Sequence, residues 1–404
     1  MILEFKKILK KNCLIYAINA ALKARQNSLK IKTLYEDYRK KADSTGVKYN
    51  EKKISEQVKI GLIKRKVYIQ KKEPGKLRIF WVGANYNQDM SGFLQGLKTF
   101  GEVVIFKNAE GGYGLLWPQT SKTKLSAEEV IKTNSEILLK QVELALKQGN
   151  LDLLMGQMWA DVLDVSVLVK IQKMGIPTIN VSMDDKLPDL WRREKGKLMG
   201  SAGLANGLNL VLTTSPDTCL WYLIEGCPAI YWPLASDPDM FYPRGEKIYD
   251  VVFVGSKYGI RGKLVGAIRK AGVKVEAYGQ GWPNGFINAQ KIAEVFGKAK
   301  IILGTGNVAY NKDILTIKLR DFDATMSDAL YITHRNPDLL KLFKEGKEIE
   351  CYDEINECIE KIKFYLAHPE KLEAIADAGY KKARENYTWE KNIGNALRII
   401  GLIK

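Results

Sequence analysis

Short apolar runs separated by longer amphipathic stretches make up most of the chain after residue 76. In the first half these runs lie at residues 77–83, 103–106, 151–155, 178–182, 210–213 and 229–232. Helical patterns lie between several of them, the longest at residues 126–148 and another at 161–174. Strands that alternate with helices predict a parallel sheet with right-handed crossovers.

A second alternation of the same kind begins after residues 236–243, which are rich in proline and aspartate and are typical of an interdomain linker. Its expected strands lie at residues 251–254, 273–278, 301–303 and 329–333. Its expected helices lie near 261–271 and 289–298, after Asp321, and in three further stretches from about 336 to the end. The chain is therefore expected to contain two successive doubly wound α/β domains.

Residues 1–75 have a different pattern, in which lysines interrupt a partial apolar stripe, and they predict helices joined by polar loops. Residues 1–76 hold 21 Lys and Arg against 7 Asp and Glu, a net +14 of the total +17. Such an arm suits an acidic partner, namely anionic lipid, an anionic glycan or nucleic acid. A solvated helical face is an equal alternative. We favour packing on the protein's own body over an interfacial amphipathic helix.

The few cysteines and histidines argue against a metal or haem site. The five cysteines form no C-x-x-C pair and there are two histidines, so a cysteine zinc site or a c-type haem is not expected. The apolar segment 13–22 is too short to span a bilayer, and no small-residue cleavage site follows it. We expect a cytoplasmic protein with reduced thiols. Peripheral contact of residues 1–75 with the inner face of the membrane is an alternative to their packing on the protein's own body.

Loops that follow strands carry the ligand chemistry in doubly wound sheets. Small residues and cations follow the strands of the second domain, and a helix is expected to begin near Lys318 beside a carboxylate. Cations suit a diphosphate and the carboxylate suits ribose hydroxyls. The residues expected to bind a nucleotide there are Gly255, Ser256, Arg261, Gly279, Gly281, Trp282, Lys318, Arg320 and Asp323. Trp282 either stacks on a base or fills core space.

Several segments of the second half resemble the C-terminal domain of CgeB-type, spore-maturation-like glycosyltransferases. They are residues 250–256, 278–282, 319–324, 336–339, 365–370 and 386–389. The resemblance implies the GT-B fold, in which two Rossmann-like domains face each other and the second holds a UDP- or GDP-linked sugar without a metal or other cofactor. It places Asp323 on the donor ribose. It places Gly255, Ser256, Arg261 and Arg320 near the diphosphate.

The sequence departs from the family pattern at two positions. The wider group of retaining glycosyltransferases has an acidic residue eight positions before the one that corresponds to Asp323, and this chain has Leu315 there. The family has glycine where this chain has Asp328, and aspartate tolerates a left-handed backbone better than most residues. A non-catalytic module that binds glycan or acts as a scaffold is therefore an alternative to the enzyme.

The first domain is expected to bind the acceptor. Gly83, Asn85 and Asp89 lie in the loop after its first strand. An inverting reaction requires a base for the acceptor hydroxyl, and the catalytic candidates are Asp185, Asp184 and His334. Helix capping is the structural alternative for the two aspartates, and a structural partner role is the alternative for the histidine.

Together these features predict a metal-independent glycosyltransferase that moves a sugar from a nucleotide donor to a glycan, cell-envelope or protein acceptor. Nucleic-acid binding through the basic arm is a third hypothesis, and it lacks a recognisable motif. The expected segments are a basic helical extension at 1–75, an acceptor domain at 76–236, a donor domain at 237–388 and a C-terminal helix at 389–404 that packs back on the acceptor domain.

Overall fold

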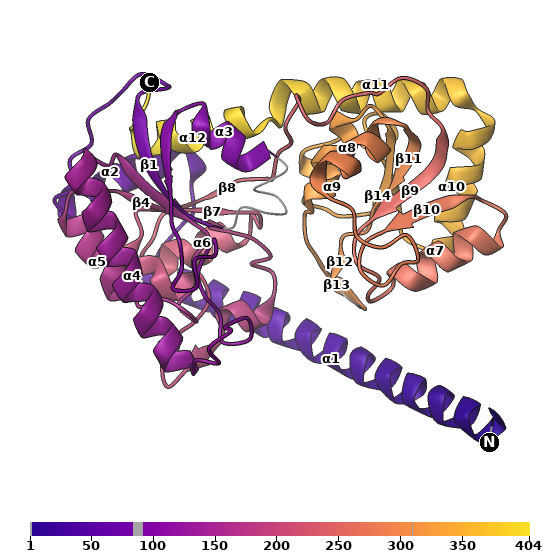
Figure 1. The fold of residues 1–404 in the computed structure, drawn as a ribbon, viewed down its shortest axis with the longest axis horizontal. Coiled ribbons are helices and arrows are strands. Elements are labelled where there is room, and N and C mark those ends of the chain that lie inside the picture. The colour runs from indigo at the N-terminus through magenta and orange to yellow at the C-terminus, as the bar shows by residue number, and fades with distance from the viewer. Residues whose placement is uncertain (1, 84–91, 309) are drawn as a thin grey trace.

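The computed structural model describes residues 2–83, 92–308 and 310–404. It contains two α/β bodies side by side, crossed on one side by the N-terminal helix and on the other by the C-terminal helices (Figure 1). Each body is built on its own parallel sheet. The two alternations of strand and helix in the sequence thus correspond to two Rossmann-like domains.

The sheet of the first domain has six strands in the order β2-β1-β3-β4-β7-β8, and all neighbours are parallel. Its strands are β1 (Leu77–Val82), β2 (Gly101–Ile105), β3 (Leu153–Gly156), β4 (Thr178–Ser182), β7 (Leu210–Thr213) and β8 (Ala229–Tyr231). Its helices are α2 (Ile54–Lys64), α3 (Leu94–Lys98), α4 (Ala127–Gln148), α5 (Val165–Lys173) and α6 (Thr218–Ile224). A capping box fixes the start of α4, because Ser126 and Glu129 satisfy each other's backbone amides.

The sheet of the second domain has five parallel strands in the order β10-β9-β11-β14-β15. Its strands are β9 (Tyr249–Val254), β10 (Val275–Tyr278), β11 (Ala299–Leu303), β14 (Leu330–His334) and β15 (Glu350–Tyr352). Its helices are α7 (Arg261–Lys270), α8 (Ala289–Gly297), α9 (Leu319–Met326), α10 (Ile355–Ala367) and α11 (Pro369–Asn386). An antiparallel hairpin of β12 (Asn307–Val308) and β13 (Asn311–Leu315) projects from it.

The chain crosses between the domains twice, and the two crossings are hydrogen-bonded to each other. Ser236 donates its amide to the carbonyl of Tyr387 at 3.0 Å and accepts from the amide of Trp389 at 3.2 Å. After this second crossing α12 (Trp389–Ile400) packs against α2 and α3 of the first domain. The aromatic rings of Phe93, Trp232 and Trp389 pack together at this joint.

Helix α1 (Ile2–Thr45) contacts both domains. On the first domain, Tyr38 stacks on Trp221 with ring centroids 4.7 Å apart and donates its hydroxyl to Glu225 at 2.8 Å. On the second domain, the side-chain amide of Asn311 in β13 donates to the Ala24 carbonyl at 2.8 Å. Helix α1 is therefore a strap across the two domains, as its diagonal course in Figure 1 shows.

The structure adds short strands to the expected elements, among them a hairpin of β5 (Arg193–Glu194) and β6 (Lys197–Leu198). The helices and polar loops expected over residues 1–75 are present as α1, α2 and the segment between them, and α1 is unbroken because no glycine or proline occurs before Gly46. The hairpin β12–β13 and the three-residue strand β15 were not predicted, because their apolar runs are too short to stand out. Among the described residues, no helix is both long and apolar enough to cross a membrane.

Replacing Tyr38 with alanine should loosen the strap. The ring is 3% exposed, so its loss removes a stacked aromatic contact and leaves a cavity, and we expect the free energy of unfolding to fall by about 3 kcal/mol. Urea unfolding measures this change, and trypsin should cleave α1 faster in the variant. Tyr68→Ala is the matched control, because that ring is 78% exposed and its loss should be near neutral. Equal stability of the two variants would contradict the bracing role of Tyr38.

Candidate functional site

The carboxyl ends of the two sheets face each other across a cleft that polar residues bridge. Lys186, which follows β4, forms an ion pair with Asp338, which follows β14. Lys318, at the start of α9, forms an ion pair with Asp184 at 3.0 Å. Parallel strands bring their following loops to one edge, so each pair joins the functional edge of one domain to that of the other.

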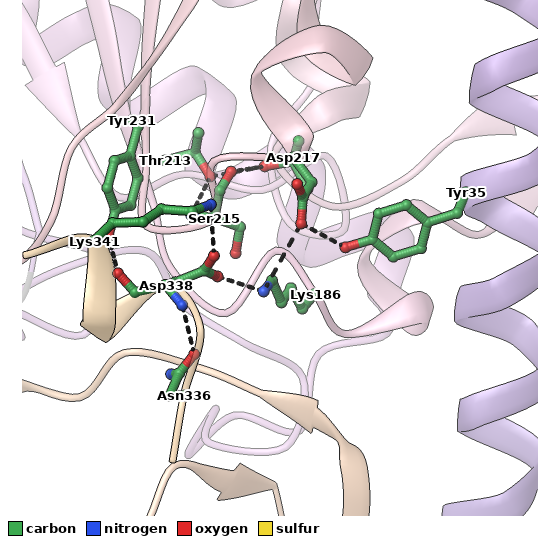
Figure 2. Close-up of polar contacts among 10 residues, drawn as sticks. Tyr35, Lys186, Thr213, Ser215, Asp217, Tyr231, Asn336, Asp338 and Lys341 are labelled. Atoms are coloured by element: carbon green, nitrogen blue, oxygen red, sulfur yellow. Dashed lines mark hydrogen bonds and ion pairs between the residues drawn. The ribbon is translucent and has the colours of Figure 1, made fainter. Parts of the chain in front are cut away.

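Figure 2 shows the first of these bridges. Asp338 is almost fully buried, and its carboxylate accepts from Lys186 and, at 3.1 Å, from Lys341. Lys186 also lies 3.9 Å from Asp217, which in turn accepts the hydroxyl of Tyr35 from α1 at 2.8 Å. One polar network thus connects α1 and both domains.

Two arginines meet at the end of β9 in the second domain. Arg320 donates its Nε to the carbonyl of Val254 at 2.8 Å, and Arg261 donates Nη1 to the carbonyl of Ser256 at 3.0 Å. Burial, followed by the charge of Arg320, lowers the pKa of Arg261 to about 10. Neither guanidinium forms an ion pair with a carboxylate of the described residues, and Nη1 of Arg320 is buried there without a hydrogen-bond partner.

Gly255 makes room for this arginine pair. A Cβ at that position would lie 2.7 Å from Nη2 of Arg320 and 3.3 Å from Nη1 of Arg261, and its φ of 149° disfavours other residues. Two neighbouring guanidiniums that have only carbonyl partners form a place for an anion. The predicted diphosphate residues Gly255, Ser256, Arg261 and Arg320 are therefore brought together.

The loop after β10 supports the loop after β9. Trp282 is buried and donates its indole nitrogen to the carbonyl of Gly255 at 2.7 Å, with its ring edge-to-face against Phe253. A Cβ on Gly279 would lie 2.6 Å from the carbonyl carbon of Gly255, so the two loops touch backbone to backbone. Gly281 lies beside Lys257 in the same contact. Trp282 thus fills core space, which is one of the two alternatives that the sequence left open.

Asp323, the expected ribose residue, lies where the chain crosses between the domains at Ser236, Tyr387 and Trp389, which we call the hinge. It is 4% exposed, and its Oδ1 accepts the hydroxyl of Ser236 at 2.7 Å. Burial raises the pKa of Asp323 well above its usual range. Because Ser236 also binds Tyr387 and Trp389, the carboxyl is fixed to the point where the chain crosses between domains.

The three catalytic candidates have different surroundings. Asp184 lies at the cleft, with a half-exposed side chain paired to Lys318. Asp185 is 1% exposed, and its carboxylate accepts hydroxyls of Ser182, Thr213 and Tyr222, so it faces the interior of the first domain and not the cleft. His334 ends β14 and packs edge-to-face on Tyr352, with ring centroids 5.7 Å apart.

The remaining predicted positions are placed as follows. Gly83 is buried at the end of β1, where a Cβ would lie 2.1 Å from the Trp81 ring. Asn85 and Asp89 lie outside the described residues. Leu315 ends β13 and is partly buried. Asp328 has a φ of 54° and precedes β14, at the opposite end of that strand from the cleft, so its carboxylate does not approach the arginine pair.

Sequence reasoning missed the bridging residues Lys186, Asp217 and Asp338 and the tyrosine that reaches them from α1, Tyr35. A signal for two of them was present. Lys186 directly follows the aspartate pair, and Asp338 lies in one of the segments that carry the family resemblance. In the part of the chain that the structure describes, no group of three or more His, Cys, Asp or Glu gathers as a metal site.

Comparison with solved structures identifies the architecture. Sucrose-phosphate synthase from Thermosynechococcus elongatus superposes with a TM-score of 0.55 at 11% identity, over 80% of this chain and 98% of that one. HepE from Anabaena, in complex with UDP and glucose, gives 0.53 at 13% identity, over 80% of this chain and 100% of that one. The chain has the GT-B fold. The fold expected from the sequence is thus confirmed.

Other comparisons bear on the second half of this GT-B protein. Residues 261–398 match a family model described as glycosyl transferase-like, a range that contains both arginines and Asp323. A glycosyltransferase from Rickettsia africae superposes with a TM-score of 0.52 at 12% identity, over 80% of this chain and 98% of that one. No curated protein sequence matches the chain. The narrower likeness to CgeB-type enzymes stays a prediction.

The burial of Asp185 predicts a specific pH dependence of stability. Burial raises the pKa of its carboxyl from 3.8 to about 6, so its contribution to stability is full below pH 4 and is lost as the pH rises through 6. Asp185→Asn cannot ionise. The free energy of unfolding of the variant, relative to the unmodified protein, should therefore rise by roughly 2 kcal/mol between pH 4 and pH 7.

Urea unfolding at a series of pH values measures this difference. Asp189→Asn is the control, because Asp189 is an exposed aspartate four residues away and its replacement should leave the shape of the stability curve unchanged. If Asp185→Asn and the unmodified protein gave parallel curves from pH 4 to pH 7, the account of this buried carboxyl would be wrong.

Proposed function

We propose that the chain is a glycosyltransferase that moves a sugar from a nucleoside diphosphate-sugar donor to a hydroxyl-bearing acceptor. The observation that carries the proposal is a pair of arginines at the end of β9, the buried Arg261 and the partly buried Arg320, without a carboxylate partner among the described residues. The glycosyl transferase-like match over residues 261–398 supports it. So does the likeness in fold to HepE, which has been solved with UDP-glucose.

In this proposal the donor diphosphate lies against the arginine pair and the backbone amides beside Gly255. The acceptor oxygen forms a bond to the anomeric carbon while the bond from that carbon to the diphosphate oxygen breaks. The nucleoside diphosphate leaves with the electron pair, and the guanidiniums stabilise the negative charge that develops on it. No metal ion is invoked, because the two arginines supply the positive charge.

The acceptor proton needs a base, and Asp184 is the proposed one among the three candidates. It is the aspartate that faces the cleft, where Lys318 holds it through their ion pair. If the reaction retains configuration, the donor phosphate takes the proton instead. His334 remains a proposed neighbour of the reacting groups, because it ends a strand at the cleft edge. Asp185 receives no role in the reaction because it is buried away from the cleft.

Asp323 stays the proposed partner of the donor ribose. It lies three residues after Arg320 in α9, on the same face of the helix, so a ribose attached to a diphosphate at Arg320 is within its reach. Its bond to Ser236 would then relate donor binding to the hinge. A UDP- or GDP-linked sugar and a glycan, cell-envelope or protein acceptor are the proposed substrates.

Residues 1–75 are proposed to contact an anionic membrane surface from the cytoplasmic side. Their net charge is of the right sign, and about 1 kcal/mol per Lys or Arg is available close to an anionic leaflet. A non-catalytic GT-B module is the second candidate function. The specific observation that favours it is Leu315, which replaces an expected acidic residue near the donor sugar.

Replacing either arginine with alanine should weaken binding of UDP. Each guanidinium is expected to form charge-assisted hydrogen bonds worth roughly 1.5–3 kcal/mol, so the Kd for UDP should rise about 10- to 100-fold in Arg261→Ala and in Arg320→Ala. Isothermal titration calorimetry measures the Kd. Lys263→Ala removes the same charge from an exposed position of α7 two residues away and should leave the Kd nearly unchanged.

Two results would count against the proposal. Equal Kd values in all three variants would remove the arginine pair as the diphosphate site. Tight UDP binding together with no release of glucose from UDP-glucose, with or without acceptors, would favour the non-catalytic module.

A further inference from the structure

A cavity of about 540 Å³ lies where α1 passes over the cleft. Four of its lining residues in α1, Ala20, Lys23, Ala24 and Asn27, are spaced three, four and seven residues apart and therefore share one face of the helix. The remaining walls come from residues 187–190 after β4 and from the hairpin β12–β13. We call this space the α1 cavity. The first domain, the second domain and the strap each supply one wall of it.

The small side chains of α1 create the space. Ala20 and Ala24 present methyl groups to it, opposite Leu187 of the first domain and Ile314 of the hairpin. Asn311 holds the helix at this distance, because its amide donates to the Ala24 carbonyl at 2.8 Å and to the Ser28 hydroxyl at 3.1 Å. The contact fixes α1 against the hairpin and leaves the alanines facing an apolar space.

The α1 cavity adjoins the arginine pair. Tyr258 lines it, and the guanidinium of Arg261 lies 4.2 Å from the centroid of the same ring. The side chain of Tyr258 therefore lies between the cavity and the proposed diphosphate site. A ligand in the cavity would have its near end beside the donor and its far end among apolar side chains.

We propose that the α1 cavity holds the apolar part of an amphiphilic acceptor, an alkyl or aryl group attached to a hydroxyl-bearing head such as a sugar. The proposal rests on the proposed glycosyltransferase function. Apolar walls favour an apolar occupant, and the adjoining arginines place the head next to the donor. Two charged residues line the cavity: Asp189 pairs with Lys30 at 3.2 Å, and Lys23 forms no ion pair among the described residues.

This assignment gives the N-terminal helix a part in substrate choice. A purely polar acceptor would leave Ala20, Ala24, Leu187 and Ile314 facing water and would gain nothing from them. The basic character of the strap and the apolar cavity that it closes would then select the same kind of molecule, one that carries an apolar tail and lies near an anionic surface.

The test compares two substitutions at adjacent alanines of α1. Ala20→Trp fills the cavity, whereas Ala21→Trp puts the same side chain on an exposed position that does not line it. The probes are octyl β-D-glucopyranoside below its micellar concentration and methyl β-D-glucopyranoside. Each is titrated calorimetrically into the full-length protein with UDP present. UDP is also titrated alone into each variant.

The octyl probe should bind the unmodified protein and Ala21→Trp with similar affinity and should bind Ala20→Trp at least about tenfold more weakly. The methyl probe should bind weakly to all three, and UDP should bind all three equally. If Ala20→Trp does not fold, Val308→Phe fills the cavity from the hairpin and is judged by the same criteria.

Each contrary outcome has a distinct meaning. Octyl binding that is equal in both tryptophan variants, or no stronger than methyl binding in the unmodified protein, overturns the proposal. Loss of UDP binding in Ala20→Trp alone would assign the cavity to the donor and also overturn it. Absence of UDP binding from the unmodified protein would instead contradict the proposed function itself, whatever the octyl probe does.

Discussion

The guanidinium groups of Arg261 and Arg320 lie side by side without a carboxylate between them, so they repel each other. The second domain nevertheless holds both groups in place. Carbonyl oxygens of Val254 and Ser256 hold the pair in place, and Gly255 leaves the room that they need. Burial and the mutual repulsion lower the pKa of Arg261. An anion between the arginines would relieve the repulsion, which is why we propose a diphosphate as the ligand of this site. The loop after β10, with Trp282 and Gly279, supports that geometry.

The interdomain ion pairs, the hinge and helix α1 surround the cleft that leads to this anion site. Ion pairs join the two domains at the cleft, and Tyr35 connects the strap to the same network. The hinge lies on the other side, where Ser236 binds Asp323 and both crossings of the chain. Helix α9 therefore carries both Arg320 of the arginine pair and Asp323 of the hinge, and the α1 cavity lies where the strap passes Tyr258 in the loop after β9.

Much of this was accessible from the sequence because parallel strands bring their following loops to one edge. That rule placed Gly255, Arg261 and Arg320 together without any knowledge of the contacts. The rule could not distinguish Asp184 from Asp185, because the side chains of adjacent residues point in different directions. Asp184 reaches the cleft, whereas Asp185 is buried in the first domain. The rule also could not foresee the Ser236–Asp323 bond, which joins residues 87 positions apart. The single helix α1 was foreseeable, because residues 2–45 contain no glycine or proline.

A crystal structure of the protein with UDP tests the central claim most directly. The account predicts the diphosphate between the guanidiniums of Arg261 and Arg320, with a phosphate oxygen accepting from the Nη1 of Arg320 that is buried without a partner among the described residues. It also predicts the α1 cavity empty of nucleotide. A structure in which UDP lies elsewhere, with the two arginines still bound only to carbonyl oxygens, would contradict the account.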